Sequence, residues 1–89
     1  MNQQQGSPPI KEFRVGGGIK VAIWRNETEQ DGRTVVQYST KPQRRYRDRQ
    51  TGEWKTTEYF RPQDLPHLIL AAQKAFEFTS LKEDEDAQE

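Results

Sequence analysis

The fold is decided by residues 19–40, which read IKVAIWRNETEQDGRTVVQYST. Successive side chains of a β-strand point to opposite faces, so Ile19, Val21 and Ile23 share one face and the residues between them share the other. This alternation predicts a half-buried strand over residues 19–25, with the branched aliphatic side chains in the core.

A hairpin turn follows this strand. Asp31 and Gly32 form the dipeptide that type I′ turns favour, because both central residues of such a turn take positive φ. We therefore expect a further strand from Thr34 towards Tyr46, paired with the preceding one. Pro42 lies inside it and cannot donate a ladder hydrogen bond, so the strand must lie at an edge or be bulged there.

Two more strands flank this hairpin. Residues 10–15 alternate in the same way, and residues 53–60 follow a reversing loop at residues 49–52. Residues 16–18 are three glycines, which suit either a phosphate-binding loop or a turn between strands. A phosphate loop leads into a helix, whereas Ile19 continues a strand, so we expect a turn or bulge. The pattern predicts a four-stranded antiparallel meander.

Helical periodicity begins at Pro62 and predicts one helix to about Leu81, with Asp64 at its start as a cap or as a charge that complements the helix dipole. Two further apolar residues, Leu70 and Phe78, lie on a second face, which suits a partner helix. The fold class is therefore α+β, a ββββα domain that we expect to pair through its helices as a homodimer. The main apolar stripe, on the face left for the sheet, comprises Leu65, Leu68, Ile69, Ala72, Phe76 and Thr79.

Length and composition set the organisation of the chain. The 89 residues, of which 30% are hydrophobic, allow one domain with a small core, near the lower limit of independent stability. The chain has no cysteine and one histidine, so we expect neither a disulfide nor a structural zinc site. Self-association remains as a source of stability, which also favours a homodimer. We assign residues 1–9 to a disordered leader rich in Gln and Pro, 10–81 to the domain and 82–89 to a disordered acidic tail.

The sequence predicts neither export nor membrane insertion. Residues 1–9 have neither a basic start nor an apolar stretch, and the longest apolar run, Leu68–Ala72, is far too short to span a bilayer. We expect a cytoplasmic protein, associated with the nucleoid if bacterial.

Charge is unevenly distributed along the chain. Fourteen basic and fourteen acidic residues cancel overall, but residues 11–61 carry twelve basic against seven acidic, and residues 62–89 carry two against seven. Such asymmetry indicates an anion-facing surface joined to an acidic tail.

The most basic segment is Lys41–Arg49, in which five of nine residues are cationic, with Trp54 and Lys55 across the next loop. Cationic side chains neutralise phosphates, and Tyr and Trp on a sheet offer faces on which unpaired bases stack. The helix has one cation, Lys74, over most of its length, which makes it a poor fit for the major groove of a duplex. We therefore expect binding of single-stranded DNA, or of unpaired RNA, with little sequence preference. The alternative is solvated charge along an exposed edge, with Tyr46 and Trp54 in the core.

Catalysis is not expected. His67 lies one turn after Asp64, a spacing that suits a metal site or a positioned base, but a surface residue of the first helical turn is the favoured interpretation. No nucleophile has a recognisable base partner, so we expect no enzyme activity, no cofactor and no metal. The rival function is a protein-interaction module or accessory subunit, supported by the zero net charge and by the apolar residues on the second helix face.

Four segments carry a resemblance to a known family: Phe13–Gly16, Val21–Ile23, Arg44 with Tyr46, and Gly52–Lys55. In these residues and in the order of its elements, the sequence resembles the positive-cofactor-four type of transcriptional coactivators and their short bacterial and phage relatives. The resemblance implies a four-strand meander with a helix, dimerisation through the helices, and binding of single-stranded DNA across the curved sheets. The resemblance implies contact with single-stranded DNA at eight positions: Arg25, Lys41, Arg44, Arg45, Tyr46, Arg47, Trp54 and Lys55.

Overall fold

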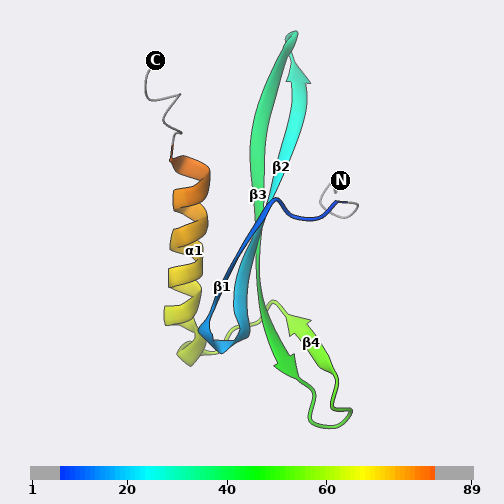
Figure 1. Cartoon of the computed structure of the whole chain (residues 1–89), viewed down its shortest axis with the longest axis vertical. Helices are drawn as coiled ribbons and strands as arrows, with labels where there is room; N and C mark the ends of the chain where they lie inside the picture. Colours follow the sequence, from blue (N-terminus) through cyan, green and yellow to red (C-terminus); the bar gives the residue numbers. More distant parts are fainter. Residues whose placement is uncertain (1–6, 82–89) are drawn as a thin grey trace.

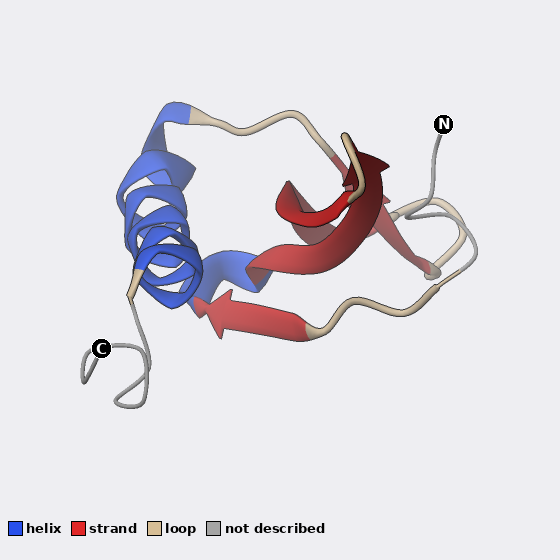
Figure 2. Cartoon of the chain, turned by 90° about the horizontal axis from the view of Figure 1, so that it is seen from above, coloured by secondary structure: helices blue, strands red, loops and turns tan. Residues whose placement is uncertain are grey.

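The computed structural model describes residues 7–81. Its strands form one antiparallel sheet in the order β1-β2-β3-β4, and helix α1 lies against one face of that sheet (Figures 1 and 2). This confirms the expected α+β, ββββα arrangement. Residues 1–6 of the expected leader and residues 82–89, the expected tail, lie outside the described residues. The elements are β1 (Lys11–Val15), β2 (Ile19–Gln30), β3 (Arg33–Arg47), β4 (Trp54–Thr57) and α1 (Leu65–Ser80), with short 3₁₀ turns at Gly16–Gly18 and Pro62–Asp64.

The turn between β2 and β3 is the two-residue turn that the sequence predicts. Asp31 has φ 52° and Gly32 has φ 75°, both positive as a type I′ turn requires. Because only two residues form the turn, β2 and β3 stay paired up to Gln30 and Arg33. β2 is therefore longer than the expected strand over residues 19–25. We call residues 25–38 the hairpin arm, since this part of β2 and β3 extends past β1 and β4 (Figure 1).

β3 is an edge strand along most of its length. Its pairing with β4 begins at Arg44, whereas its pairing with β2 covers the hairpin arm and continues to that residue. Pro42 pairs with Val21 of β2 and has no neighbour on its other side in the described sheet. Pro42 therefore lies at an edge, as its missing N–H predicts.

β4 is shorter than expected, since it ends at Thr57 and not near Phe60. The Tyr59 backbone N–H donates to Thr57 Oγ1 at 3.1 Å, and Arg44 Nε donates to the Tyr59 carbonyl at 3.3 Å. These two hydrogen bonds turn the chain away from the ladder. The turn brings Phe60 against the core.

The core lies between β2 and α1. Ile19, Val21 and Ile23 of β2 are buried, and they pack with Ala71 and Ala75 of α1. The expected inward face of β2 is therefore confirmed. Because alanine has no side chain beyond Cβ, the helix can lie close to the sheet along this face.

The helix face predicted from periodicity is wrong at most of its positions, although Leu68 of that stripe is partly buried against the core. Ile69 and Phe76, which belong to the expected stripe, are each 66% exposed. The buried face is instead that of Ala71 and Ala75, because small residues let a helix approach a sheet more closely than bulky side chains do. Four apolar residues of the expected stripe are left exposed, and we call them the outer helix face: Leu65, Ile69, Ala72 and Phe76.

The two residues predicted at a helix-to-helix interface, Leu70 and Phe78, are both exposed to a similar degree. The Phe78 ring also packs edge-to-face on Phe13 of β1, with 6.0 Å between the ring centroids. Phe78 therefore contributes to the contact of α1 with the sheet, while Leu70 lies on the surface.

The three glycines form a turn between β1 and β2, as the strand that follows them predicts. Gly17 and Gly18 have φ of 77° and 75°, values that residues with a side chain rarely adopt. A Cβ added to Gly18 would lie 2.6 Å from the carbonyl oxygen of Arg45 in β3. Gly18 is therefore needed both for the conformation of the turn and for its contact with β3.

Gly18→Ala should destabilise the domain more than Gly32→Ala. Both glycines have φ of 75°, so both substitutions carry the cost of a left-handed alanine, about 1–2 kcal/mol. An added Cβ meets nothing within 4 Å at Gly32, but it meets the Arg45 backbone at Gly18, which adds strain. Urea denaturation should give the lower midpoint for Gly18→Ala, and equal midpoints would contradict the close approach of the turn to β3.

Candidate nucleic-acid interface

The sheet has one face covered by α1 and one open face (Figure 2). Paired residues on neighbouring antiparallel strands lie on the same face. Lys20 pairs with Arg14 of β1 and with Gln43 of β3. Because Ile19 and Val21, on either side of Lys20, face α1, these three polar residues lie on the open face.

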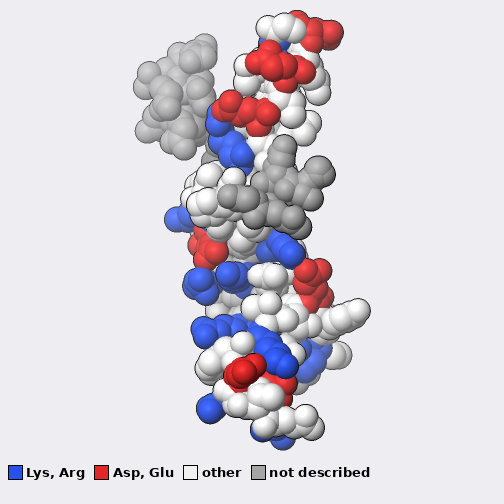
Figure 3. All heavy atoms as spheres, turned by 90° about the vertical axis from the view of Figure 1, so that its right-hand side faces the viewer, with Lys and Arg blue, Asp and Glu red and all other residues white. Residues whose placement is uncertain are grey.

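The same alternation places residues of β3 and β4 on the open face. Arg45 pairs with Thr56, and Arg47 pairs with Trp54. Figure 3 shows this side of the molecule: most Lys and Arg lie over the body of the sheet, among several Asp and Glu, whereas the hairpin arm shows mainly Asp and Glu. Positive charge is therefore concentrated where the four strands lie side by side.

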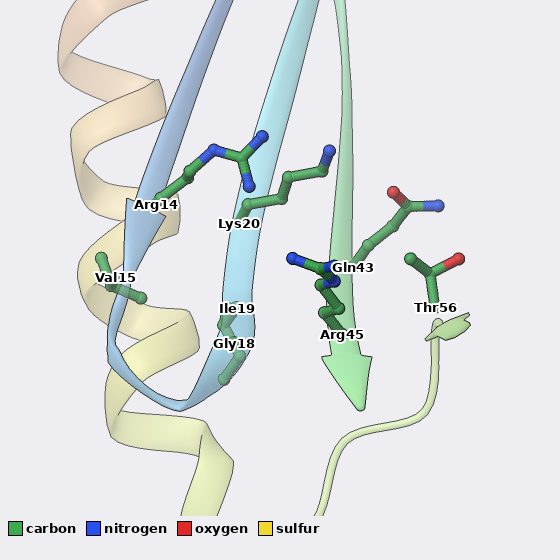
Figure 4. Close-up of a pocket in the computed structure, with 8 residues that line it drawn as sticks. All are labelled: Arg14, Val15, Gly18, Ile19, Lys20, Gln43, Arg45 and Thr56. Carbon is green, nitrogen blue, oxygen red and sulfur yellow. The ribbon is translucent and has the colours of Figure 1, made fainter. Parts of the chain in front are cut away.

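A hollow of about 210 Å³ opens on this face, lined by residues of all four strands (Figure 4). Three cationic side chains, those of Arg14, Lys20 and Arg45, reach it from three different strands, and none of the lining residues is acidic. We call it the basic hollow. Its lining residues are Arg14, Val15, Gly18, Ile19, Lys20, Gln43, Arg45 and Thr56.

One carboxylate lies beside the basic hollow. Glu12 accepts from Arg14 Nη2 at 2.8 Å and from Lys20 Nζ at 3.4 Å. All three side chains are partly or largely solvent-exposed, and such ion pairs contribute at most about 1 kcal/mol each. The pairs are therefore weak enough for a stronger anion to replace Glu12.

Arg45 also has an aromatic neighbour. Its guanidinium carbon lies 4.6 Å from the centroid of the Trp54 ring, a cation–π distance, and Trp54 is 57% exposed. A planar cation beside an exposed indole combines charge neutralisation with a stacking surface. Single-strand binding depends on both of these contacts.

Half of the residues predicted to contact single-stranded nucleic acid lie together on the open face of the sheet. Lys41 Nζ forms an ion pair with Glu58 at 3.2 Å, and Arg47 Nε donates to the Gly52 carbonyl at 3.1 Å. Both cations are therefore held in place without being buried. The four predicted residues on this face are Lys41, Arg45, Arg47 and Trp54.

The other four predicted residues lie elsewhere. Arg44 and Tyr46 take the α1 side of the sheet, because the odd-numbered residues of this part of β3 take the open side, and Lys55 pairs with Tyr46. Arg25 lies on the hairpin arm, where it forms an ion pair with Glu27. The structure does not bring these four residues to the basic hollow.

Lys55 orders the loop between β3 and β4. Its ammonium donates to Asp48 Oδ2 at 2.8 Å, and the backbone N–H groups of Gln50 and Thr51 donate to the same side chain. The hydrogen bond between them lowers the pKa of Asp48 and raises the pKa of Lys55. Lys55 therefore helps to fix the loop that precedes Trp54.

Arg44 has a structural partner. Its Nε lies 3.2 Å from Oδ2 of Asp64, and its side chain is 14% exposed. Asp64 is 2% exposed and also accepts from the backbone N–H, Nε and Nη2 of Arg61 at 2.8, 3.0 and 2.9 Å. The hydrogen bonds from Arg61, and then the nearby charges of Arg61 and Arg44, lower the pKa of Asp64 to about 2. The Asp64 carboxylate thus holds two arginines and makes no capping hydrogen bond to α1.

Sequence reasoning misses four polar residues that line the basic hollow. Lys20 carries a usable signal, since it lies between two buried residues of β2 and must point to the opposite face. The others depend on the register of the strands, which the sequence alone does not determine. The missed residues are Arg14, Lys20, Gln43 and Thr56.

Trp24 also lies on the open face, opposite Ser39 of β3. Its indole Nε1 donates to the Ser7 carbonyl at 3.0 Å, so the segment before β1 lies against the ring. Trp24 is therefore less accessible to a ligand than Trp54.

The chain matches no protein-family model, no curated protein and no solved structure. The resemblance to the positive-cofactor-four type of coactivators therefore stays a prediction.

Within residues 7–81, His67 does not belong to a group of side chains that could hold a metal ion. Its exposed ring lies beside Gly16 and Gly17, near the start of α1. Across residues 7–81, His, Asp and Glu side chains form no group of three or more that could hold a metal ion, and no helix there has the length and apolar character needed to cross a membrane.

Acid should destabilise the domain through Asp64. Its pKa is about 2 in the folded protein against an ordinary 3.8, so the unfolded chain takes up this proton at a higher pH than the folded chain. The stabilisation is complete above pH 3.8 and is lost as the pH falls towards about 2. Urea denaturation at a series of pH values should show a steeper loss of the free energy of unfolding in the native protein than in Asp64→Asn.

Asp48→Asn is the control, because it removes a carboxylate of the exposed β3–β4 loop and leaves Asp64 in place. In this control the free energy of unfolding should still fall between pH 3.8 and about 2, because Asp64 is present. In Asp64→Asn this part of the fall should be missing. Identical slopes for Asp64→Asn and the native protein would show that Asp64 does not carry this dependence.

Proposed function

We propose that this protein binds single-stranded nucleic acid, DNA in preference to RNA, on the open face of its sheet, and that it catalyses no reaction. The observation that carries the proposal is the basic hollow with the Arg45 and Trp54 side chains stacked beside it. The resemblance to coactivators that bind single-stranded DNA supports it. Binding to nucleic acid also agrees with action in the cytoplasm, the location that the sequence predicts.

In this proposal phosphates replace Glu12 as the partners of Arg14 and Lys20, and a base stacks on Trp54. Affinity comes chiefly from neutralised phosphates, a term that depends on salt and hardly on sequence. Stacking on one aromatic ring adds about 1–3 kcal/mol for any base. Together these contacts give a binder whose main surface has little sequence preference.

A single strand suits this surface better than a duplex. Duplex readers usually insert a helix into the major groove, but the described helix offers one cation, Lys74, which is paired with Glu77 at 3.7 Å. The cations lie instead on a sheet face beside an exposed indole. Bases of a duplex are stacked on one another and cannot reach such a ring without unpairing.

We also propose a homodimer that forms through the outer helix face. Only six apolar residues of the described chain are buried, three of them alanines, which is a small core for an independent domain. The outer helix face presents Ile69 and Phe76, each 66% exposed and seven residues apart on the same side of α1. Covering these side chains with a second copy would supply the burial that one copy lacks.

Anisotropy titration of a labelled single strand of about 20 nucleotides should show binding that exceeds binding of the matching duplex and of the matching RNA. If three phosphates are neutralised, the logarithm of the binding constant should fall against the logarithm of salt concentration with a slope of about −2. Absence of binding to any of these strands at low salt would contradict the proposal.

Variants test whether the basic hollow is the site. Arg45→Glu should weaken single-strand binding by about tenfold or more and reduce the salt slope, because it removes one cation and adds repulsion. Arg33→Glu makes the same charge change on the hairpin arm and should have a small effect. Glu12→Gln should tighten binding, because it removes the carboxylate that competes with phosphate. Equal losses in the two arginine variants would show that net charge, and not the hollow, controls affinity.

Replacing Ile69 and Phe76 by Asp should dissociate the dimer, raising its dissociation constant by about 30-fold or more, because both side chains would be anchors of the interface. Sedimentation equilibrium measures this change. Leu70→Asp is the matched control on the other side of α1 and should leave the dimer intact. Dissociation by Leu70→Asp alone would move the interface to the face of Leu70 and Phe78. A monomeric native protein that binds no nucleic acid would favour the rival function, docking of a different protein.

A further inference from the structure

A second hollow lies next to the basic hollow, where β4 ends and the free edge of β3 begins. It measures about 470 Å³. Two residues, Gln43 and Thr56, line both hollows and form the wall between them. A strand with one phosphate in the basic hollow would therefore place a neighbouring nucleotide at the second. The lining residues are Gln43, Thr56, Thr57, Glu58 and Tyr59.

Tyr59 is the most exposed large apolar or aromatic residue of the described chain, at 83%. Its backbone is nevertheless fixed, because its N–H donates to Thr57 Oγ1 at 3.1 Å and its carbonyl accepts from Arg44 Nε at 3.3 Å. Arg44 is in turn held by the buried Asp64. The protein thus holds an aromatic ring in solvent on a well-anchored piece of backbone, and such a ring offers its face to a base.

The polar groups of the second hollow add hydrogen-bonding capacity. Gln43 has a carbonyl oxygen that accepts and an amide NH₂ that donates, and the Glu58 carboxylate accepts. Glu58 forms an exposed ion pair with Lys41, whose Nζ lies 3.2 Å from Oε2. Side-chain acceptors of this kind pair with exocyclic amino groups: Gln pairs with adenine, and Glu pairs with the N4 amine of cytosine.

We propose that the second hollow is a nucleobase subsite that favours cytosine and adenine, whose exocyclic amines lie where thymine and guanine have a carbonyl oxygen, over thymine. A base stacks on Tyr59 and presents its amine to the Glu58 carboxylate, while the Gln43 amide can pair with either kind of base. Thymine presents a carbonyl oxygen at the corresponding position, which the Gln43 amide NH₂ can pair with but the acceptor-only Glu58 carboxylate cannot. The inference rests on the proposed function and adds to it a modest base preference, which phosphate contacts alone do not provide.

The test compares oligo-dC with oligo-dT strands of about 20 nucleotides, since both are pyrimidine strands and differ in the exocyclic group. At mildly alkaline pH, where oligo-dC stays unfolded, the native protein should bind oligo-dC about fivefold more tightly than oligo-dT. Glu58→Gln, which replaces the acceptor-only carboxylate by an amide that also donates, should bring this ratio close to one. Tyr59→Ala should weaken binding of both strands by about tenfold, and Tyr59→Phe, which keeps the ring, should restore it.

Tyr38→Ala is the control, because Tyr38 is an exposed tyrosine of the hairpin arm, away from both hollows. It should leave both affinities and their ratio unchanged. Equal affinity of the native protein for the two strands would overturn the base preference while leaving the proposed function in place. Unchanged binding in Tyr59→Ala would overturn the subsite. Failure to bind either strand would overturn the proposed function and this inference with it.

Discussion

The packing of β2 on α1 is the contact on which the other features depend. Ile19, Val21 and Ile23 meet Ala71 and Ala75, and this choice of face determines where every alternate side chain of the sheet points. Once one face of β2 is covered, Lys20, which alternates with the buried residues, and Arg14, which pairs with it, point to the open face. The core and the candidate interface are thus two results of one pattern with a period of two.

A buried carboxylate connects this core to the end of the sheet. Asp64 holds Arg61, just before α1, and Arg44 of β3, so the helix start and the strand are joined through one side chain. Two arginines on one carboxylate leave a positive charge, which explains why Asp64 stays ionised although it is buried. Arg44 consequently acts in the structure of the domain, and the cations of β3 that are available to a ligand are its odd-numbered neighbours.

The sequence predicted the elements and one face of β2, because alternation and turn chemistry are local. Asp31 and Gly32 specify their turn without help from the rest of the chain. The buried face of α1 was not predicted, because helical periodicity marks apolar side chains and gives little weight to alanines that allow close packing. The candidate interface was half predicted for a similar reason. Arg45 and Trp54 lie in or beside an evidently basic segment, whereas the position of Arg14 on the open face depends on which residue of β2 it pairs with.

The uneven charge of residues 11–61 gives this part of the folded molecule an electric dipole moment directed along the hairpin arm. The hairpin arm has three carboxylates against two guanidinium groups, while the rest of residues 11–61 has ten basic against four acidic residues. Most Lys and Arg lie over the body of the sheet, whereas the arm shows mainly Asp and Glu (Figure 3). In the field of any polyanion the molecule turns before contact, so that the sheet body approaches first and the arm trails into solvent. The hairpin that extends the sheet therefore also contributes to how the protein is oriented as it approaches a polyanion.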